Sequence, residues 1–339
     1  MKTVILKPGG SVELVEQEIP KACDDIVVVK VHTAPMCTEF YKYRDGVEDL
    51  CLGHEAAGEV VEVAQPGKVK PGDRVVVMPQ YPCGKCSLCL NGDYIHCQDV
   101  MDPLKSCSCE GGVATYSQYV LKQDWLLIPI PDEMSYDHAS MACCGLGASF
   151  GAIQAMDVGP FDTVLVTGLG PVGLGAVINC AIRGASVIGV ARNEYRAGLA
   201  LQLGADKVLD PEDPDCIKKI RDLTGGKGAD KSVDCSGGEE YQKLCVRGTR
   251  RRGHVAFVGE SGDLTLRVSD DLIRNGLTLH GAWHWNLQYT DLVMETIRRS
   301  APLINKLVTH TFPLSRVEEA FKLQMTGKCG KVLLYPQPG

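Results

Sequence analysis

The feature that most constrains the fold of this chain is a regular alternation of strand-like and helix-like segments between residues 153 and 288. Short runs rich in Val and Ile, such as TVLVTG, SVIGVA and HVAFVG, are separated by helix-like stretches such as PVGLGAVINCAIRG. Strands that alternate with crossover helices form a parallel sheet covered by helices. We therefore expect an α/β fold in which this region is a doubly wound domain.

The segments on either side of this region have a different character. Residues 1–152 carry β-branched runs between turn signals, among them IVVVKVHT and GDRVVVM, and are expected to form a β-rich domain. Residues 289–339 add helix-like segments and end in the strand-like KVLLYP, and we expect this tail to return to the first domain. A length of 339 residues suits two domains.

Composition excludes several classes of partner and location. A net charge of −7 gives no attractive field for nucleic acid or for acidic lipid. No apolar run approaches the ~20 residues of a membrane span, and no signal peptide is visible, so a cytoplasmic location is expected. Thiols stay reduced there, so the 16 cysteines indicate metal ligands and small buried apolar residues rather than disulfides.

A glycine-rich turn opens the alternating region and predicts a nucleotide site. In GLGPVG, Gly168, Gly170 and Gly173 have the spacing G-x-G-x-x-G, with Pro171 and Val172 between the last two. The three glycines permit a tight turn, close approach of a pyrophosphate, and close packing of helix on strand. The helix that follows directs free N–H groups at the phosphate.

The end of the next strand indicates which nucleotide is bound. NAD sites usually place an acidic residue there for the ribose 2′-hydroxyl, but this chain has Ala191, followed by Arg192 and Arg196. A guanidinium binds a 2′-phosphate bidentately. NADP(H) is therefore favoured over NAD(H), and the alternative is a solvated arginine at a site that still takes NAD.

Four cysteines in residues 79–98 predict a structural zinc site, namely Cys83, Cys86, Cys89 and Cys97. Four thiolates on one loop close a tetrahedral Zn²⁺ site that stabilises the loop and leaves no position for a substrate. The alternatives are scattered buried cysteines and a nucleic-acid zinc ribbon, which the acidic net charge and the single lysine within the loop oppose.

Ligand-type residues also occur in three separate fragments, with Cys37 in APMCTEF, His54 and Glu55 in LGHEAAG, and Cys143 and Cys144 in MACCGLG. One such residue is more often packing than ligand. Three such fragments beside a nucleotide site favour a second, reactive metal.

Together these motifs resemble the zinc-dependent medium-chain alcohol dehydrogenase family over nearly the whole length. The resemblance rests on Cys37, GHE at 53–55, GDRV at 72–75, the four-cysteine loop, GLGPVG at 168–173 and the terminal GKCGKVLL. It implies a GroES-like catalytic domain (1–152 with 289–339) around a Rossmann domain (153–288). It also implies two zinc ions per chain and a homodimer or homotetramer.

The resemblance assigns roles to individual residues. Cys37, His54 and Cys144 fall on the ligands of the catalytic zinc; Cys144 fits because it precedes Gly145 and stands at the family's distance from Phe150-Gly151. Glu55 is expected beside the metal, and Lys331 near the pyrophosphate. Zinc then polarises the substrate oxygen while the nicotinamide exchanges a hydride.

One departure from the family pattern concerns Glu39. Two places after the first ligand the family usually has Ser or Thr, which starts a proton relay, and then Asp, which orients the ligand histidine. This chain has Glu39 and Phe40 there. Phe40 cannot orient an imidazole, and Glu39 is predicted to accept the alcohol proton, bind substrate hydroxyls or join the metal shell; the alternative is an unrelated surface glutamate.

These observations predict an enzyme that interconverts an alcohol and its carbonyl. Glu39, together with the aromatic cluster GAWHWN at 281–286, favours a polyol- or sugar-like secondary alcohol, although the cluster could equally be packing at an interface. A zinc-free quinone or enoyl reductase on the same fold and a non-catalytic NADPH-binding protein are the alternatives, and the ligand fragments oppose both.

Overall fold

A computed structural model describes residues 1–260 and 262–338 and divides the chain into two compact units. The first unit comprises Met1–Cys143, Asn286–Arg298 and Val308–Gly339, and the second comprises Cys144–Trp285 and Arg299–Leu307. Among the described residues, no helix combines the length and the apolar character needed to cross a membrane.

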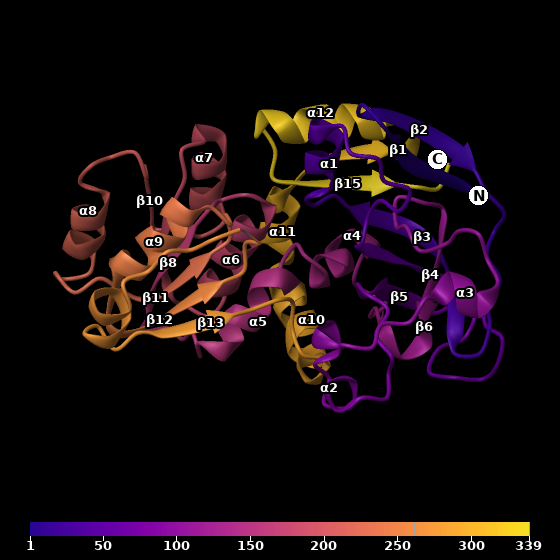
Figure 1. Cartoon of the computed structure of the whole chain (residues 1–339), viewed down its shortest axis with the longest axis horizontal. Coiled ribbons are helices and arrows are strands. Elements are labelled where there is room, and N and C mark those ends of the chain that lie inside the picture. The colour runs from indigo at the N-terminus through magenta and orange to yellow at the C-terminus, as the bar shows by residue number, and fades with distance from the viewer. Residues whose placement is uncertain (261, 339) are drawn as a thin grey trace. The chain divides into compact units, whose positions relative to one another are not determined.

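The second unit contains a six-stranded sheet with all neighbouring strands parallel, in the order β10-β9-β8-β11-β12-β13 (Figure 1). This order places β8 next to β11, so the order of strands reverses between them, as in a doubly wound fold. The strands are β8 (Thr163–Thr167), β9 (Ser186–Val190), β10 (Lys207–Leu209), β11 (Ala229–Asp234), β12 (Thr249–Phe257) and β13 (Thr278–Gly281). The helices are α5 (Gly147–Ala155), α6 (Pro171–Ala181), α7 (Glu194–Gln202), α8 (Cys216–Leu223), α9 (Glu239–Gly248) and α11 (Ala301–Leu307). The expected α/β fold is confirmed.

The first unit is β-rich, as expected, and its main sheet runs β14-β15-β3-β4-β5-β7, with β6 also paired to β3. The strands are β1 (Lys2–Lys7), β2 (Ser11–Glu16), β3 (Ile26–Pro35), β4 (Ala56–Glu62), β5 (Arg74–Val77), β6 (Tyr119–Gln123), β7 (Leu127–Pro129), β14 (Val308–Pro313) and β15 (Lys331–Tyr335). The helices are α1 (Glu39–Asp45), α2 (Ser87–Leu90), α3 (Pro103–Cys107), α4 (Tyr136–Ala139), α10 (Thr290–Arg299) and α12 (Val317–Thr326). Valines of β3, β4 and β5 pack with Phe321 of α12 in one apolar core, which joins the tail of the chain to the amino-terminal strands.

The tail does not return to the first unit as a whole, which corrects the expectation for residues 289–339. Helix α11 belongs to the second unit and packs on α6 and α7. The physical reason is its apolar face, because Ile304 and Leu307 have no exposed surface.

One disulfide joins Cys23 and Cys107, which corrects the expectation that the cysteines form no disulfides. Both cysteines pack against an apolar cluster formed by Ile26, Val28 and Leu121. Cys109 belongs to the same cluster as a free thiol.

Candidate active site

Strand register brings three remote segments to one edge of the first unit's sheet. Strand β4 runs antiparallel to β3, with Ala57 opposite Thr33, so the residues before β4 lie near the end of β3. Strand β15 is also antiparallel to β3, with Leu333 opposite Pro35, so its first residue, Lys331, lies near the same end. Cys37 follows β3, and His54 and Glu55 precede β4. The sheet therefore brings Cys37, His54 and Glu55 together with Lys331 from sequence positions far apart.

Four side chains offer ligand atoms that all lie within 4.8 Å of one another, and these are Cys37, His54, Glu55 and Cys144. Cys144 joins this group directly after Cys143, the residue at which the first stretch of the first unit ends. Cys143 points elsewhere, because its thiol donates to the carbonyl of Val77 at 3.4 Å and burial raises the pKa of that thiol to about 12. Two sulfurs, an imidazole and a carboxylate are donors that suit Zn²⁺.

Glu39 holds the ligand histidine. The His54 Nδ1–H donates to Glu39 Oε1 at 2.7 Å, so in this tautomer Nε2 carries the lone pair that a metal would bind. The other carboxylate oxygen, Oε2, accepts from the Cys37 backbone N–H at 3.0 Å and from the Tyr116 hydroxyl at 2.9 Å. Burial opposes ionisation of Glu39, but the neighbouring imidazole and these hydrogen bonds lower its pKa to about 2. The imidazole thus has an orienting carboxylate one place earlier than the family pattern puts it.

Gly53 allows this arrangement to form. Its backbone is left-handed, with φ of +85°, and a Cβ there would lie 2.4 Å from both the Thr115 hydroxyl and the ring of Tyr116. Sequence analysis gave no role to Tyr116, because no motif marks it and only the tertiary fold brings it to Glu39.

Glu55 and Lys331 form a fully buried ion pair, with Nζ 2.7 Å from Oε1. Burial raises the pKa of Glu55 to about 7, and the ammonium of Lys331 opposes that rise. The same Oε1 lies 3.9 Å from His54 Nε2, so the carboxylate is close to the position where a metal would bind. Lys331 has no exposed surface, and its predicted contact with a pyrophosphate stays a prediction.

The four-cysteine loop has the geometry of a closed metal site. Measured between sulfurs, Cys86 lies 3.5 Å from Cys89 and 3.9 Å from Cys97, and Cys97 lies 3.6 Å from Cys83. A tetrahedral ion with ligand bonds of about 2.3 Å separates its sulfurs by roughly 3.8 Å. The thiols fit a zinc ion.

The electrostatics of these thiols also favour a bound cation. A backbone N–H from Lys85 lowers the pKa of Cys83 to about 7, whereas burial and neighbouring sulfurs raise that of Cys89 to about 12. Four thiolates this close repel one another unless a cation neutralises them.

The loop is also tied to a later segment of its own unit, because the Leu287 N–H donates to the Gly92 carbonyl at 3.0 Å.

The glycine-rich turn follows β8 and leads into α6, as predicted. Gly168 has φ of +75°, and a Cβ on Gly173 would lie 2.1 Å from the Gly168 carbonyl oxygen, so that position requires glycine. Pro171 and Val172 form the first turn of α6, and Pro171 has no N–H to leave unpaired.

Two arginines follow β9 in different settings. Arg196 Nη1 lies 3.9 Å from the place where a Cβ on Gly170 would be, close to the glycine-rich turn. Arg192 is largely exposed, and its Nη1 lies 3.4 Å from a carboxylate oxygen of Glu212. Both residues of this ion pair, with Tyr241, line a cavity of about 410 Å³.

The GAWHWN segment lies partly in the interior. Trp285 is fully buried and His284 nearly so, whereas Trp283 is 41% exposed. His284 Nε2 lies 3.7 Å from the sulfur of Cys144, within range of an N–H···S contact. Sequence analysis placed His284 only in an aromatic cluster; its left-handed backbone, with φ of +57°, has no signal in the sequence.

Comparison with known proteins supports the same reading. Residues 24–132 match the family described as alcohol dehydrogenase GroES-like domain, and residues 171–299 match zinc-binding dehydrogenase. An uncharacterized zinc-type alcohol dehydrogenase-like protein of Escherichia coli, YphC, is 31% identical over 98% of this chain and 99% of its own. L-threonine 3-dehydrogenase of Bacillus licheniformis is 32% identical over 99% of each chain. A solved NAD-dependent alcohol dehydrogenase is 27% identical over 99% of this chain and all of its own, with a TM-score of 0.82.

The ligand group, the glycine-rich turn and these matches over the full length agree. The chain belongs to the zinc-dependent medium-chain alcohol dehydrogenase family and is an NAD(P)-dependent oxidoreductase.

Proposed function

We propose that this enzyme holds two zinc ions, one in each of the two ligand groups, and interconverts a secondary alcohol and its ketone. The observation that carries the proposal is the convergence of Cys37, His54 and Cys144 with an orienting carboxylate behind the histidine. A zinc ion there supplies Lewis acidity toward the substrate oxygen, and the nicotinamide supplies hydride transfer. This donor set argues against a zinc-free reductase.

The chain's own residues prepare the site for this chemistry. Glu39 fixes the ring plane of His54 and the tautomer in which Nε2 carries the lone pair that a metal would bind. The Glu39 hydrogen bond to the Cys37 backbone ties the first ligand to the same carboxylate. Lys331 offsets the charge of Glu55, so the buried carboxylate is paired whether or not a metal is bound.

We assign Glu39 as a positioning residue in this mechanism. Its two oxygens already accept three hydrogen bonds, from His54, Cys37 and Tyr116, which supports orientation of the ligands over proton abstraction from the substrate.

The proposed substrate is a secondary alcohol with a further polar group beside the carbinol, a polyol- or sugar-like compound among them. Glu39 and Trp285 no longer support this choice strongly, since Glu39 serves His54 and Trp285 is buried. The support comes instead from the relative that is named for acting on L-threonine, whose position 3 is a secondary carbinol beside polar groups.

NADP(H) is the proposed cofactor, and Arg192 its determinant. The ion pair between Arg192 and Glu212 is exposed on both sides, and such pairs contribute little, so a 2′-phosphate can replace Glu212 as the partner. Arg192→Ala should lower kcat/KM for NADPH about 10- to 150-fold, the equivalent of 1.5–3 kcal/mol for a charged hydrogen bond, and leave NADH unchanged. Glu212→Gln is the matched control and should favour NADPH slightly. A wild-type preference for NADH would contradict the assignment.

Metal analysis and a substrate panel test the function as a whole. Purified protein should contain about two zinc ions per chain and lose turnover when a chelator removes the more labile one. The panel should pair both cofactors with polyols, sugars, L-threonine and simple alkyl alcohols. One zinc or none, with turnover of quinones or enones, would support the zinc-free reductase instead.

A further inference from the structure

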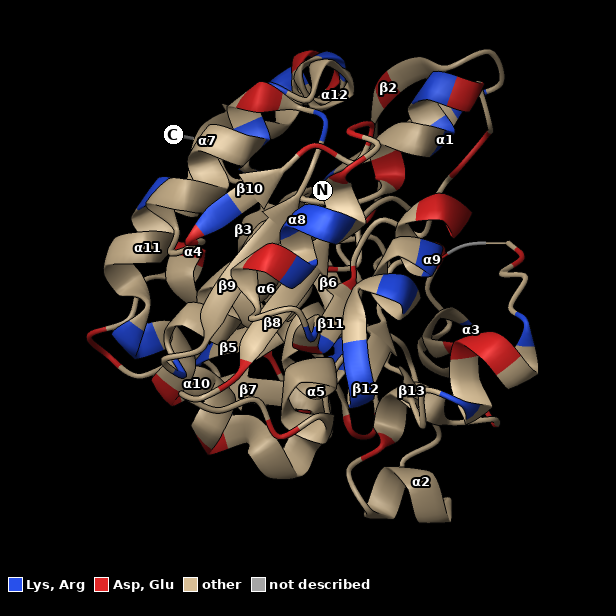
Figure 2. Ribbon diagram, turned by 90° about the vertical axis from the view of Figure 1, so that its left-hand side faces the viewer, with Lys and Arg blue, Asp and Glu red and all other residues tan. Residues whose placement is uncertain are grey.

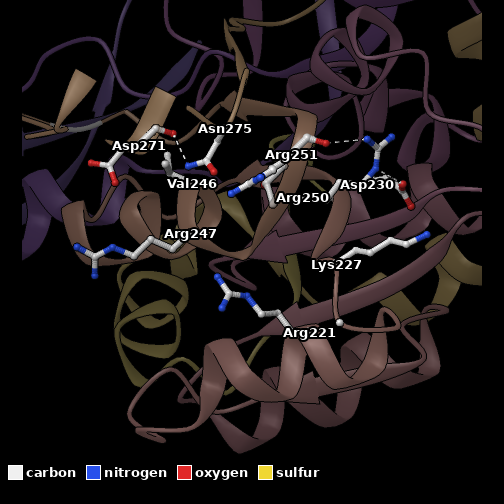
Figure 3. A pocket seen from close by; sticks show the side chains of 11 residues that line it. Arg221, Lys227, Asp230, Val246, Arg247, Arg250, Arg251, Asp271 and Asn275 are labelled. Atoms are coloured by element: carbon white, nitrogen blue, oxygen red, sulfur yellow. Dashed lines mark hydrogen bonds and ion pairs between the residues drawn. The ribbon is translucent and has the colours of Figure 1, made fainter. Parts of the chain in front are cut away.

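A cavity on the second unit is lined by basic side chains, of which only Arg247 also lines the cavity that contains Arg192 (Figure 3). Its volume is about 790 Å³. The cationic lining residues are Arg221, Lys227, Arg247, Arg250 and Arg251, and the acidic ones are Asp230 and Asp271. Five positive against two negative charges leave a surplus of three in a chain whose net charge is −7. The local charge is therefore opposite in sign to that of the molecule.

The cations come from separate elements that meet where β11 and β12 begin. Arg221 stands in the last turn of α8 and Arg247 in the last turn of α9, Lys227 lies in the turn before β11, and Arg250 and Arg251 open β12. Figure 2 shows basic residues on β12, whose sequence has arginines and no lysine. The glycine-rich turn follows the end of β8, which is parallel to β11. The cavity and that turn therefore lie at opposite ends of the strands, roughly 15–20 Å apart for strands of this length.

Most of these cations have no carboxylate partner. Asp230 is taken by Arg250, with Oδ1 2.6 Å from Nε, and its other oxygen accepts from the Thr163 backbone N–H at 2.9 Å. Within residues 1–260 and 262–338, no ion pair involves Arg221, Lys227, Arg247 or Arg251. Partial negative charge at a helix carboxyl end accounts for a cation in the last turns of α8 and α9. It does not account for Lys227, Arg250 and Arg251.

We propose that this cavity binds a small oligophosphate, either free or as the phosphate chain of a nucleotide. Guanidinium groups bind phosphate oxygens bidentately, and several of them around one cavity suit adjacent phosphates better than a single anion. A ligand with three or four negative charges neutralises the surplus of three. Nucleic acid fits less well, because a long polyanion would extend beyond the cavity over a surface of net negative charge.

Calorimetric titration of the whole enzyme with inorganic tripolyphosphate tests the proposal. Saturating NADPH occupies the cofactor site throughout, including the proposed position of its 2′-phosphate, and the buffer contains about 150 mM salt, which weakens diffuse attraction. Arg221→Gln with Arg251→Gln removes two cations from different walls, and Arg247 is left intact because it also lines the cavity that contains Arg192. The matched control, Lys207→Gln with Lys218→Gln, removes the same charge from exposed positions of this unit outside the cavity.

We expect 1:1 binding by the wild type, at least tenfold weaker binding by the Arg221/Arg251 variant, and a change below twofold in the control. Dehydrogenase activity should stay unchanged in both. Titration with ATP identifies the source of the phosphates. Equal affinity for ATP and tripolyphosphate indicates that the phosphate chain alone is bound, and tighter binding of ATP indicates a nucleotide.

Three results would overturn the proposal. They are absence of tripolyphosphate binding with and without NADPH, binding that occurs only in a parallel titration without NADPH, and equal weakening in the control variant. If the double variant is unstable, Arg251→Gln alone serves, since Arg251 lies on a strand and not at a helix end, and it should still weaken binding severalfold.

Discussion

The two cysteine-containing ligand groups of this enzyme differ in how their donors are supplied. Cys83, Cys86, Cys89 and Cys97 come from one loop, and all four donors are sulfur. Cys37, His54 and Cys144 come from three remote segments, mix sulfur with nitrogen, and have a carboxylate, Glu55, beside them. A loop with four thiolates would saturate its ion, whereas three ligands would leave a fourth position for substrate.

The surroundings of the two groups differ as well. Glu39 accepts hydrogen bonds from His54 and Tyr116. The buried ion pair of Glu55 and Lys331 lies beside His54. The loop cysteines are supported mainly by the backbone, for example by the Cys83 N–H toward the sulfur of Cys97 at 3.3 Å. The contrast indicates that side-chain support is concentrated where a ligand must keep one orientation through a reaction.

The largest expected effect follows removal of a ligand from the group of Cys37, His54 and Cys144, which we call the mixed group. Cys144→Ala should release the catalytic zinc and lower kcat by roughly 10³-fold or more, since a Lewis acid supplies several kcal/mol of stabilisation. Zinc analysis and steady-state kinetics measure both. Cys143→Ala is the matched control and should keep both ions and most activity, because its thiol contacts the Val77 carbonyl. Loss of zinc from Cys143→Ala but not from Cys144→Ala would reverse the assignment.

Sequence alone indicated the loop site and the fold more completely than the mixed site. Four cysteines within 15 residues can meet only locally, and the β-α alternation with GLGPVG is also a local signal. Cys37, His54 and Cys144 became a group only through the family resemblance, because the approach of Cys37 to His54 depends on the pairing of β3 with β4 and no sequence signal places Cys144 beside them.

The support around His54 could not be read from the sequence. Glu39 stands one position before the place where the family has its orienting carboxylate, and only the turn into α1 shows that its side chain reaches His54. Tyr116 is 77 positions away from Glu39 in the chain. Contacts of this kind depend on side-chain direction and strand register, which periodicity does not specify.

The second expected effect tests that support. In Glu39→Gln the amide –NH₂ would replace an oxygen that accepts from both Cys37 and Tyr116, or the amide would turn and face His54 with a donor. Affinity for the catalytic zinc should fall about 10- to 100-fold, and kcat/KM with it. Chelator competition measures the zinc affinity.

Glu48→Gln is the control for this change, because Glu48 is an exposed glutamate in the neighbouring segment. It should behave as the wild type. If Glu39→Gln instead kept its zinc and lost only kcat with an altered pH profile, Glu39 would act on the substrate and the mixed group would need no carboxylate behind His54.

A smaller effect is expected at His284. His284→Asn keeps a residue type that tolerates the left-handed backbone but shortens the side chain that approaches the sulfur of Cys144. With Co²⁺ in the catalytic site, the sulfur-to-metal charge-transfer band should shift, and kcat should change about two- to tenfold, as for loss of one hydrogen bond. Trp283→Phe, at a more exposed neighbour, should leave the band unchanged. An unshifted band in His284→Asn would show that the contact does not reach the metal.

The smallest effect on catalysis, together with a large one on stability, is expected in the loop. Cys89→Ser removes one of four sulfurs from a site that positions no substrate, so one zinc per chain should be lost. The unfolding free energy should fall by about 3 kcal/mol, equivalent to roughly 6–12 °C in Tm, because binding of a structural ion contributes to folding. Below the transition, kcat/KM should stay within twofold of the wild type.

The control is Cys51→Ser, at an exposed free cysteine outside both groups, which should change neither zinc content nor Tm. If Cys89→Ser kept its stability and lost turnover, the loop would contribute to the reaction, and the contrast between a bracing site and a reactive one would fail.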